Sequence, residues 1–123
     1  MKILLVEDEP GTRAALSKLL RRAGAKVTAA GEGSEALQHL FEQKFDVLLT
    51  DLHMPGAAMD GFGLLEQVHR LPLDHRPKRT IAISGEYDRG VLQSVLRDSP
   101  GVDFFPKPID LNSLLDTIGG VAH

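Results

Sequence analysis

The chain has 123 residues, the length of one globular domain, and its 42% hydrophobic content is sufficient for a buried core. It contains no cysteine, which excludes disulfides and thiolate metal sites, and its net charge of −3 argues against direct binding to nucleic acid or to an anionic membrane. The apolar runs are too short to span a bilayer, and the first residues do not resemble a signal peptide. We therefore expect a single cytoplasmic domain over residues 1–123.

Five short apolar runs alternate along the chain with five segments whose apolar residues recur at helical spacing. The runs predict strands over residues 2–6, 26–30, 45–51, 80–84 and 102–105. Helices are predicted to begin at Pro10, near Gly33, near Gly61, after Asp88 and after Asp110.

Turn and capping residues support several of these helix limits. Pro10 suits the first turn of a helix, where its missing N–H costs nothing, and Gly24 is a suitable stop for the same helix. Asp110 is a suitable N-cap for the last helix. In the second helix the apolar residues expected on one inward face are Leu37, Leu40 and Phe41.

The order of the segments predicts the fold. Residues 45–51 are apolar at consecutive positions, which is typical of a strand buried on both faces. Alternating strands and helices predict a doubly wound (βα)₅ domain of the α/β class, a three-layer sandwich with helices on both faces of a parallel sheet. In such folds the ligand site lies beyond the carboxyl ends of the strands.

Polar residues follow four of the five predicted strands, and their types suggest one kind of chemistry. Glu7, Asp8 and Asp51 would bring three carboxylates together, which repel one another unless a cation is bound. A hard divalent ion such as Mg²⁺ prefers this oxygen-rich environment. Ser84 adds a hydroxyl and Lys107 a positive charge, and this combination suits a phosphoryl group. One carboxylate could act as the nucleophile and form an aspartyl phosphate.

The sequence resembles the receiver domain of two-component response regulators, especially the single-domain, chemotaxis-regulator-like members. Each matching stretch is weak alone, but together they extend from one end of the chain to the other in the expected order. The resemblance implies a flavodoxin-like sheet of strand order 2-1-3-4-5. The stretches that carry it are residues 4–10, 51–55, 59–61, 84–85 and 103–108.

The resemblance also implies roles for individual residues. Asp51 would be the phosphoacceptor, Ser84 would hydrogen-bond the phosphoryl group, and Lys107 would pair with its charge. The bond between Lys107 and Pro108 would be cis and would direct the ammonium group into the site. Mg²⁺ would be held by Asp8 and Asp51 directly, by the backbone carbonyl of His53, and by Glu7 through water.

As in the family, phosphorylation is expected to move Ser84 and rotate Phe104, which changes the surface formed by the fourth helix, fifth strand and fifth helix. A sensor histidine kinase or a histidine phosphotransfer protein would supply the phosphoryl group, and a downstream target would dock on the changed surface. The domain would be a monomer, or a dimer on phosphorylation. It would catalyse only its own phosphorylation and dephosphorylation. His53 and Glu86 would tune the lifetime of the phosphorylated state.

Two features depart from the family pattern. Residues 56–58 (Gly-Ala-Ala) lengthen the loop after Asp51 by about two residues, a change that surface loops tolerate well. Phe104 occupies a position where many relatives carry Tyr, so any coupling through this ring must rely on packing.

Three other functions remain open at this point. A haloacid-dehalogenase-type phosphatase also uses a strand-end Asp and Mg²⁺, but it normally carries a second Asp where this chain has His53. A flavodoxin-like cofactor binder would need a phosphate-binding loop after the first strand, where this chain has acids. A degenerate receiver would act only as a protein-binding module, although the full set of acceptor residues argues against that.

Overall fold

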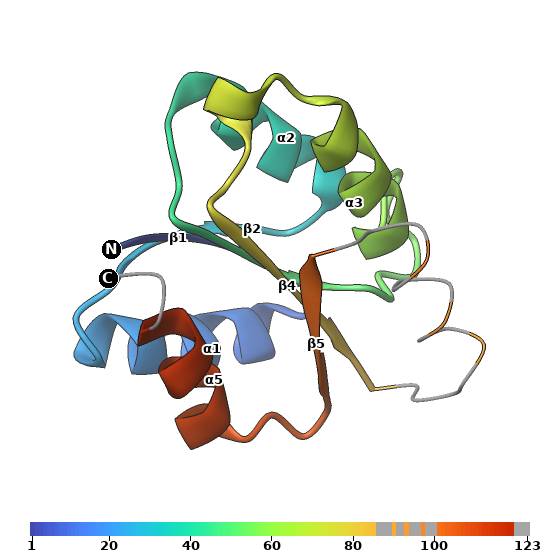
Figure 1. Cartoon of the computed structure of the whole chain (residues 1–123). Helices are drawn as coiled ribbons and strands as arrows, with labels where there is room; N and C mark the ends of the chain where they lie inside the picture. Colours follow the sequence, from blue (N-terminus) through green and yellow to red (C-terminus); the bar gives the residue numbers. More distant parts are fainter. Residues whose placement is uncertain (86–89, 91–92, 94–96, 98–100, 120–123) are drawn as a thin grey trace.

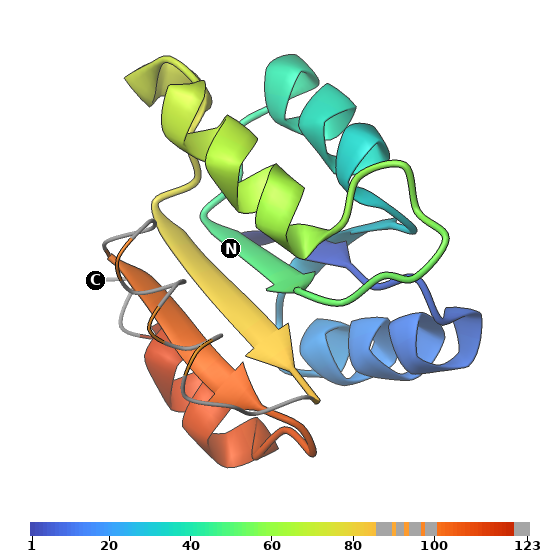
Figure 2. The same ribbon diagram turned by 90° about the vertical axis from the view of Figure 1, so that its right-hand side faces the viewer.

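A computed structural model of the chain describes residues 1–85, 90, 93, 97 and 101–119. Five parallel strands form one sheet in the order β2-β1-β3-β4-β5, as the family resemblance implied. The arrows of β3, β4 and β5 point the same way in Figure 2, so their carboxyl ends share one edge of the sheet. The strands are β1 (Lys2–Val6), β2 (Lys26–Ala30), β3 (Val47–Asp51), β4 (Arg79–Ser84) and β5 (Val102–Pro106).

Helices cover both faces of the sheet, which makes the domain a three-layer α/β sandwich. In Figure 1, α2 and α3 lie on one side of the strands, and α1 and α5 lie on the other. Most of the helix expected after Asp88 lies outside the described residues, and Gly90, Gln93 and Arg97, which are described, are helical. The described helices are α1 (Pro10–Arg22), α2 (Gly33–Glu42), α3 (Gly61–Arg70), the short 3₁₀ helix η1 (Leu73–His75) and α5 (Leu111–Gly119).

The hydrophobic core lies in layers on the two sides of β3, whose five residues are all buried. Leu48 packs among side chains from α2 and α3, whereas Leu49 packs among side chains from α1 and α5. This alternation follows from the pleat of the strand, because successive side chains point to opposite faces. The prediction that this strand is buried on both faces is therefore confirmed.

Capping groups confirm several predicted helix limits. The Glu9 side chain accepts a hydrogen bond of 3.0 Å from the backbone N–H of Gly11 at the start of α1. Gly24 follows the end of that helix with a φ of +99°, a conformation that favours glycine. At the start of α5, Asp110 accepts hydrogen bonds from the backbone N–H groups of Asn112 and Ser113.

One predicted core residue is wrong. Leu40 is fully buried and Leu37 packs against the core, but 59% of the Phe41 side chain is exposed. Successive residues in a helix are about 100° apart, so a helix that buries Leu40 turns its neighbour toward its flank. The inward position is taken instead by the fully buried Ala36. Among the helices that the structure describes, none is both long and apolar enough to cross a membrane.

Candidate functional site

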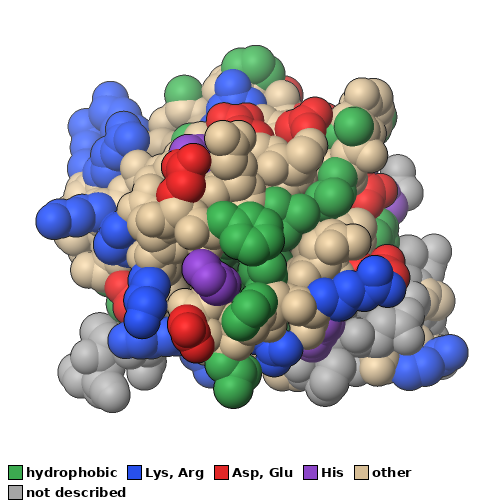
Figure 3. Space-filling model, turned by 90° about the horizontal axis from the view of Figure 1, so that it is seen from above, with side chains coloured by type: hydrophobic (Ala, Val, Ile, Leu, Met, Phe, Trp, Pro, Cys, Tyr) green, Lys and Arg blue, Asp and Glu red, His purple; other side chains and the backbone are tan. Residues whose placement is uncertain are grey.

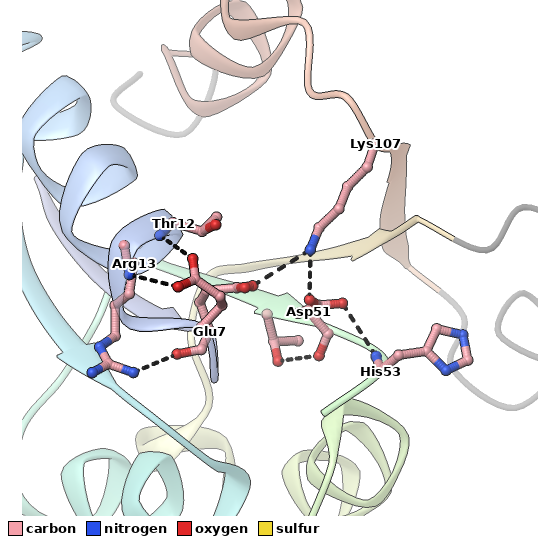
Figure 4. A network of polar contacts seen from close by, with 9 residues as sticks. Glu7, Thr12, Arg13, Asp51, His53 and Lys107 are labelled. Carbon is pink, nitrogen blue, oxygen red and sulfur yellow. Dashed lines mark hydrogen bonds and ion pairs between the residues drawn. The ribbon is translucent and has the colours of Figure 1, made fainter. Parts of the chain in front are cut away.

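The carboxyl ends of β1 and β3 and the segment after β5 bring three charged side chains together (Figure 4). The Lys107 Nζ atom lies 2.7 Å from Oδ2 of Asp51 and 3.7 Å from Oε2 of Glu7. Glu7 follows β1, Asp51 ends β3 and Lys107 follows β5, so the parallel topology explains why distant residues meet. The Lys107–Pro108 peptide bond is cis, as the family resemblance implied.

Three carboxylates form an acidic cluster beside this ion pair. One oxygen from each of Glu7, Asp8 and Asp51 lies within 4.8 Å of the others. Glu7 and Asp51 are buried, and Asp8 is half-buried. Buried carboxylates at such distances need a neutralising charge, and the single ammonium of Lys107 faces two of the three. The donor set is thus chemically suited to Mg²⁺, which binds carboxylate oxygens and retains waters.

The close approach of these charged groups shifts the pKa values of Glu7 and Lys107. Burial, together with the adjacent Asp51, raises the pKa of Glu7 from 4.5 to about 7, although the charge of Lys107 lowers it in part. Partial burial lowers the pKa of Lys107, but the Asp51 and Glu7 carboxylates raise it overall. Near neutral pH Glu7 is therefore protonated in part of the molecules, and a divalent cation would compete with that proton.

The loop that follows Asp51 donates a backbone hydrogen bond to the Asp51 carboxylate. The backbone N–H of His53 donates a 3.1 Å hydrogen bond to Oδ1 of Asp51, so the two carboxylate oxygens have different partners. The His53 side chain points away from this carboxylate in Figure 4, and its ring lies edge-on to Phe62 with centroids 5.4 Å apart. Gly61 approaches the strand so closely that a Cβ atom there would lie 2.0 Å from the Asp51 carbonyl oxygen.

The two predicted switch residues lie on neighbouring strands. Ser84 is completely buried at the end of β4, and its carbonyl accepts a 2.9 Å hydrogen bond from the backbone N–H of Lys107. Phe104 is half-buried in β5 and packs against the small cluster of Leu52, Leu65 and Ala82. Glu86 and most of the helix expected after Asp88 lie outside the described residues.

Two residues of the site were not predicted from the sequence. The Arg13 guanidinium donates a 2.8 Å hydrogen bond to the Glu7 backbone carbonyl, reaching from the first turn of α1. The Thr50 hydroxyl donates to the carbonyl of Asp51 at 2.9 Å. Both contacts involve backbone acceptors, which any residue provides, so the sequence holds no pattern that points to them.

The fold and the site together define an α/β domain with an acidic pocket and a lysine at the carboxyl edge of a parallel sheet. Comparison with known families matches residues 3–119 to the response regulator receiver domain. The chain therefore belongs to the response regulator receiver family of two-component systems.

Individual relatives agree with this assignment. The chain is 35% identical to the transcriptional activator protein PfeR of Pseudomonas aeruginosa, over 92% of this chain and 35% of PfeR. It is 36% identical to the two-component response regulator ARR11 of Arabidopsis thaliana, over 93% of this chain and 21% of that protein. The structure of Vibrio cholerae chemotaxis protein CheY4 aligns with a TM-score of 0.84 and 28% identity, over 98% of this chain and 97% of that one.

These relatives also limit what the family assignment says. The chain spans about a third or less of the length of these curated relatives, so the activities of the whole proteins are not assigned to it. They include both bacterial and plant proteins, so membership alone does not assign a source to the chain.

Proposed function

We propose that this domain accepts a phosphoryl group on Asp51 from a phosphohistidine, carried by a sensor histidine kinase or a histidine phosphotransfer protein. The observation that supports it best is the 2.7 Å contact between Lys107 Nζ and Asp51 Oδ2 beside the acidic cluster. Among the clustered carboxylates, Asp51 is buried, ends the central strand and is fixed through both of its oxygens. A carboxylate held in this way is preorganised for in-line attack.

The proposed transfer is a simple exchange of bonds. An Asp51 carboxylate oxygen forms a bond to phosphorus while the phosphorus–nitrogen bond of the donor phosphohistidine breaks. The bonding electron pair returns to the imidazole nitrogen, which then takes up a proton. Lys107 stays within reach of the new phosphoryl oxygens and offsets part of their charge. Hydrolysis of the aspartyl phosphate by water would restore the carboxylate, and no other substrate would be turned over.

The residues that would hold Mg²⁺ are Asp8 and Asp51 directly, the backbone carbonyl of His53, and Glu7 through water. The metal, when bound, supplies positive charge that the transferring phosphoryl group requires. The three carboxylates and the raised pKa of Glu7 fit such an ion, because a divalent charge would relieve their repulsion.

The proposed output is a change of packing at Phe104. Ser84 would hydrogen-bond a phosphoryl oxygen, and Phe104 would then rotate toward the space that Ser84 leaves. Phe104 packs against the cluster that contains Leu52, the residue directly after Asp51, and this supports the coupling. The altered face of the fourth helix, β5 and α5 would dock a downstream target, with the domain as a monomer or a phosphorylation-dependent dimer. The compartment that we propose for this exchange is the cytoplasm.

His53 and Glu86 are proposed to tune how fast water reaches the aspartyl phosphate. For His53, two observations support this proposal. His53 lies two residues after Asp51 in the chain, and its ring contacts the ring of Phe62. Removing either side chain is expected to change the lifetime of the phosphorylated state without changing the acceptor.

Intact mass spectrometry tests the proposal. The protein is incubated with Mg²⁺ and acetyl phosphate, beside Asp51→Asn and beside a sample containing EDTA. One added phosphoryl group on the wild type alone would support the proposal. Because a short-lived adduct could escape detection, the same samples are examined by NMR with beryllofluoride, a stable phosphoryl mimic. An absence of response in both experiments would favour a degenerate receiver that only binds proteins.

A further inference from the structure

The exposed Phe41 side chain marks a surface that the proposed phosphoryl transfer does not use. Among the residues that the structure describes, only three large hydrophobic side chains are more than a third exposed, and Leu73 is the most exposed of them at 78%. Phe41 lies in the last turn of α2, and Leu73 is the first residue of η1. Both lie toward the amino ends of the strands, at the opposite edge of the sheet from Asp51.

Two recesses lie beside these apolar side chains and form one groove. One recess, of about 290 Å³, is lined by Phe41 and His75, and the other, of about 360 Å³, by Leu73 and Phe45. Lys44 and Asp74 line both recesses, so the two are adjacent; together we call them the α2–η1 groove.

The walls of the groove are held in place by local contacts. The rings of Phe41 and His75 lie 5.6 Å apart, and Nδ1 of His75 is 3.3 Å from the carbonyl oxygen of Leu40. Arg76 donates hydrogen bonds of 2.8 and 2.7 Å to the carbonyls of Leu71 and His69 at the end of α3. Residues that are fixed before a partner arrives lose little conformational freedom on binding.

The rim of the larger recess carries more cations than carboxylates, although the chain as a whole is acidic. Four cations and two carboxylates line it: Lys2, Lys44, Arg76 and Lys78 against Asp46 and Asp74. Asp46 is already occupied, since its Oδ2 accepts from the backbone N–H of Lys2 at 2.8 Å and its Oδ1 lies 3.4 Å from Lys78. Within the described part of the chain, neither Lys44 nor Arg76 forms an ion pair with a carboxylate.

In Figure 3, hydrophobic side chains and a histidine gather over the α2 and η1 layer, and lysines and arginines collect to the left of them. Contiguous exposed apolar side chains rimmed by charge are typical of protein interaction sites.

We infer that the α2–η1 groove docks an acidic, amphipathic protein segment, with an apolar side chain between Leu73 and Phe45 and a carboxylate beside Lys44 and Arg76. The positive charge of the rim favours a partner with negative charge, and the exposed apolar residues would contact an apolar side chain of that partner. Because the groove lies at the far edge of the sheet, the segment would bind whether or not Asp51 is phosphorylated. The inference therefore does not depend on the proposed phosphoryl transfer.

A displayed library of random twelve-residue peptides tests this inference with the intact chain. Three variants are compared with the wild type: Leu73→Ser and Lys44→Glu in the groove, and Leu19→Ser as the control. Leu19 is the third exposed hydrophobic side chain but belongs to α1, on the other face of the sheet. All three changes are at exposed positions, so each variant is expected to fold. Circular dichroism checks this before binding is compared.

The expected peptides carry Asp or Glu beside Leu, Ile or Phe. Their binding should weaken by about tenfold or more with each groove variant and remain unchanged with Leu19→Ser. Peptides that are basic, that bind all three variants equally, or that cannot be selected at all would overturn the inference. Sedimentation that reveals a dimer lost on Leu73→Ser would also overturn it, because the occupant would then be a second copy of the chain.

Discussion

Lys107 Nζ lies 2.7 Å from Oδ2 of Asp51, although 56 residues separate them in the chain. The contact depends on β3, β4 and β5 being adjacent and parallel, because only then do the end of β3 and the segment after β5 reach the same edge. It also depends on Lys107 being anchored, since its backbone N–H donates to the Ser84 carbonyl at the end of β4. The sheet thus determines which lysine can meet the acceptor.

Replacing Lys107 with Gln should slow phosphorylation of Asp51 by about tenfold or more, because the charge that stabilises the transferring group is lost. Lys44→Gln provides a matched control, as it removes an exposed lysine that lines the groove far from Asp51. Intact mass spectrometry with acetyl phosphate over time measures both rates. Equal rates for the wild type and Lys107→Gln would show that the contact does not assist transfer.

Glu7 should make the metal-free domain less stable as the pH rises. Its pKa is about 7 in the folded state against 4.5 ordinarily, so between these values the folded protein binds more protons than the unfolded one. The free energy of unfolding therefore falls as the pH rises from about 4.5 to about 7. Glu7→Gln should be more stable than the wild type at pH 8, by on the order of 2 kcal/mol, and nearly equal to it at pH 5.

Urea unfolding at the two pH values, with EDTA and then with saturating Mg²⁺, measures this difference. Mg²⁺ should reduce the advantage of Glu7→Gln at pH 8, because it stabilises the charged carboxylate in the wild type. An advantage of the variant that is independent of both pH and Mg²⁺ would contradict the assigned origin of the pKa shift.

Gly61→Ala should destabilise the domain by on the order of 2 kcal/mol and weaken its response to Mg²⁺. A Cβ at this position would lie 2.0 Å from the Asp51 carbonyl oxygen and 2.6 Å from Cα of Leu52, so the acceptor loop must move. Gly119→Ala, in the last turn of α5 with nothing within 4 Å of its Cβ, serves as the control and should be neutral or slightly stabilising. Urea unfolding measures the free energy of unfolding of the two variants. Equal values would mean that the loop after Asp51 can move to accommodate the Cβ atom without cost.

Fluorine NMR should detect the proposed switch at Phe104. The chain has five phenylalanines, so fluorophenylalanine labelling gives few resonances, and Phe104→Leu assigns the one of interest. Beryllofluoride with Mg²⁺ should shift the Phe104 resonance in the wild type and leave it unshifted in Ser84→Ala. The Phe41 resonance, at the opposite edge of the sheet, is the internal reference and should not move. A Phe104 shift that persists in Ser84→Ala would show that the movement of Phe104 does not depend on the Ser84 hydroxyl.

His53→Ala should shorten the lifetime of the aspartyl phosphate by several fold, on the order of what one steric barrier to water contributes. Although the ring points away from the Asp51 carboxylate, it packs beside Phe62 next to the loop that follows the acceptor, and its loss would remove bulk that shields this loop from water. Dephosphorylation is followed after removal of the donor, with Phe62→Ala as the companion variant that removes the packing partner. An unchanged lifetime in both variants would show that neither ring affects the rate of dephosphorylation.

The sequence was sufficient to predict a parallel sheet and the residues that gather at its carboxyl edge, for a physical reason, whereas the strand order came from the family resemblance. Alternating apolar runs and helical segments leave a parallel sheet as the simple solution, and its carboxyl edge then collects Glu7, Asp8, Asp51 and Lys107. The cis bond before Pro108 followed from family resemblance and not from composition.

Other features could not be predicted because they depend on the register of helices and on backbone contacts. Phe41 follows Leu40 in an apolar helix face, and only the packed helix decides which of them is buried. Arg13 reaches the Glu7 carbonyl, an acceptor that every residue has. The need for Gly61 arises from a close approach between segments that the sequence pattern does not encode.

The measurement that tests the central claim most directly is the location of the phosphoryl group. After reaction with acetyl phosphate and Mg²⁺, borohydride reduces an aspartyl phosphate to homoserine, which peptide mass spectrometry locates. We expect homoserine at position 51 alone, and none when Mg²⁺ is withheld. Homoserine at position 8 or 60, or an equal yield without Mg²⁺, would contradict the assignment of Asp51 as the acceptor.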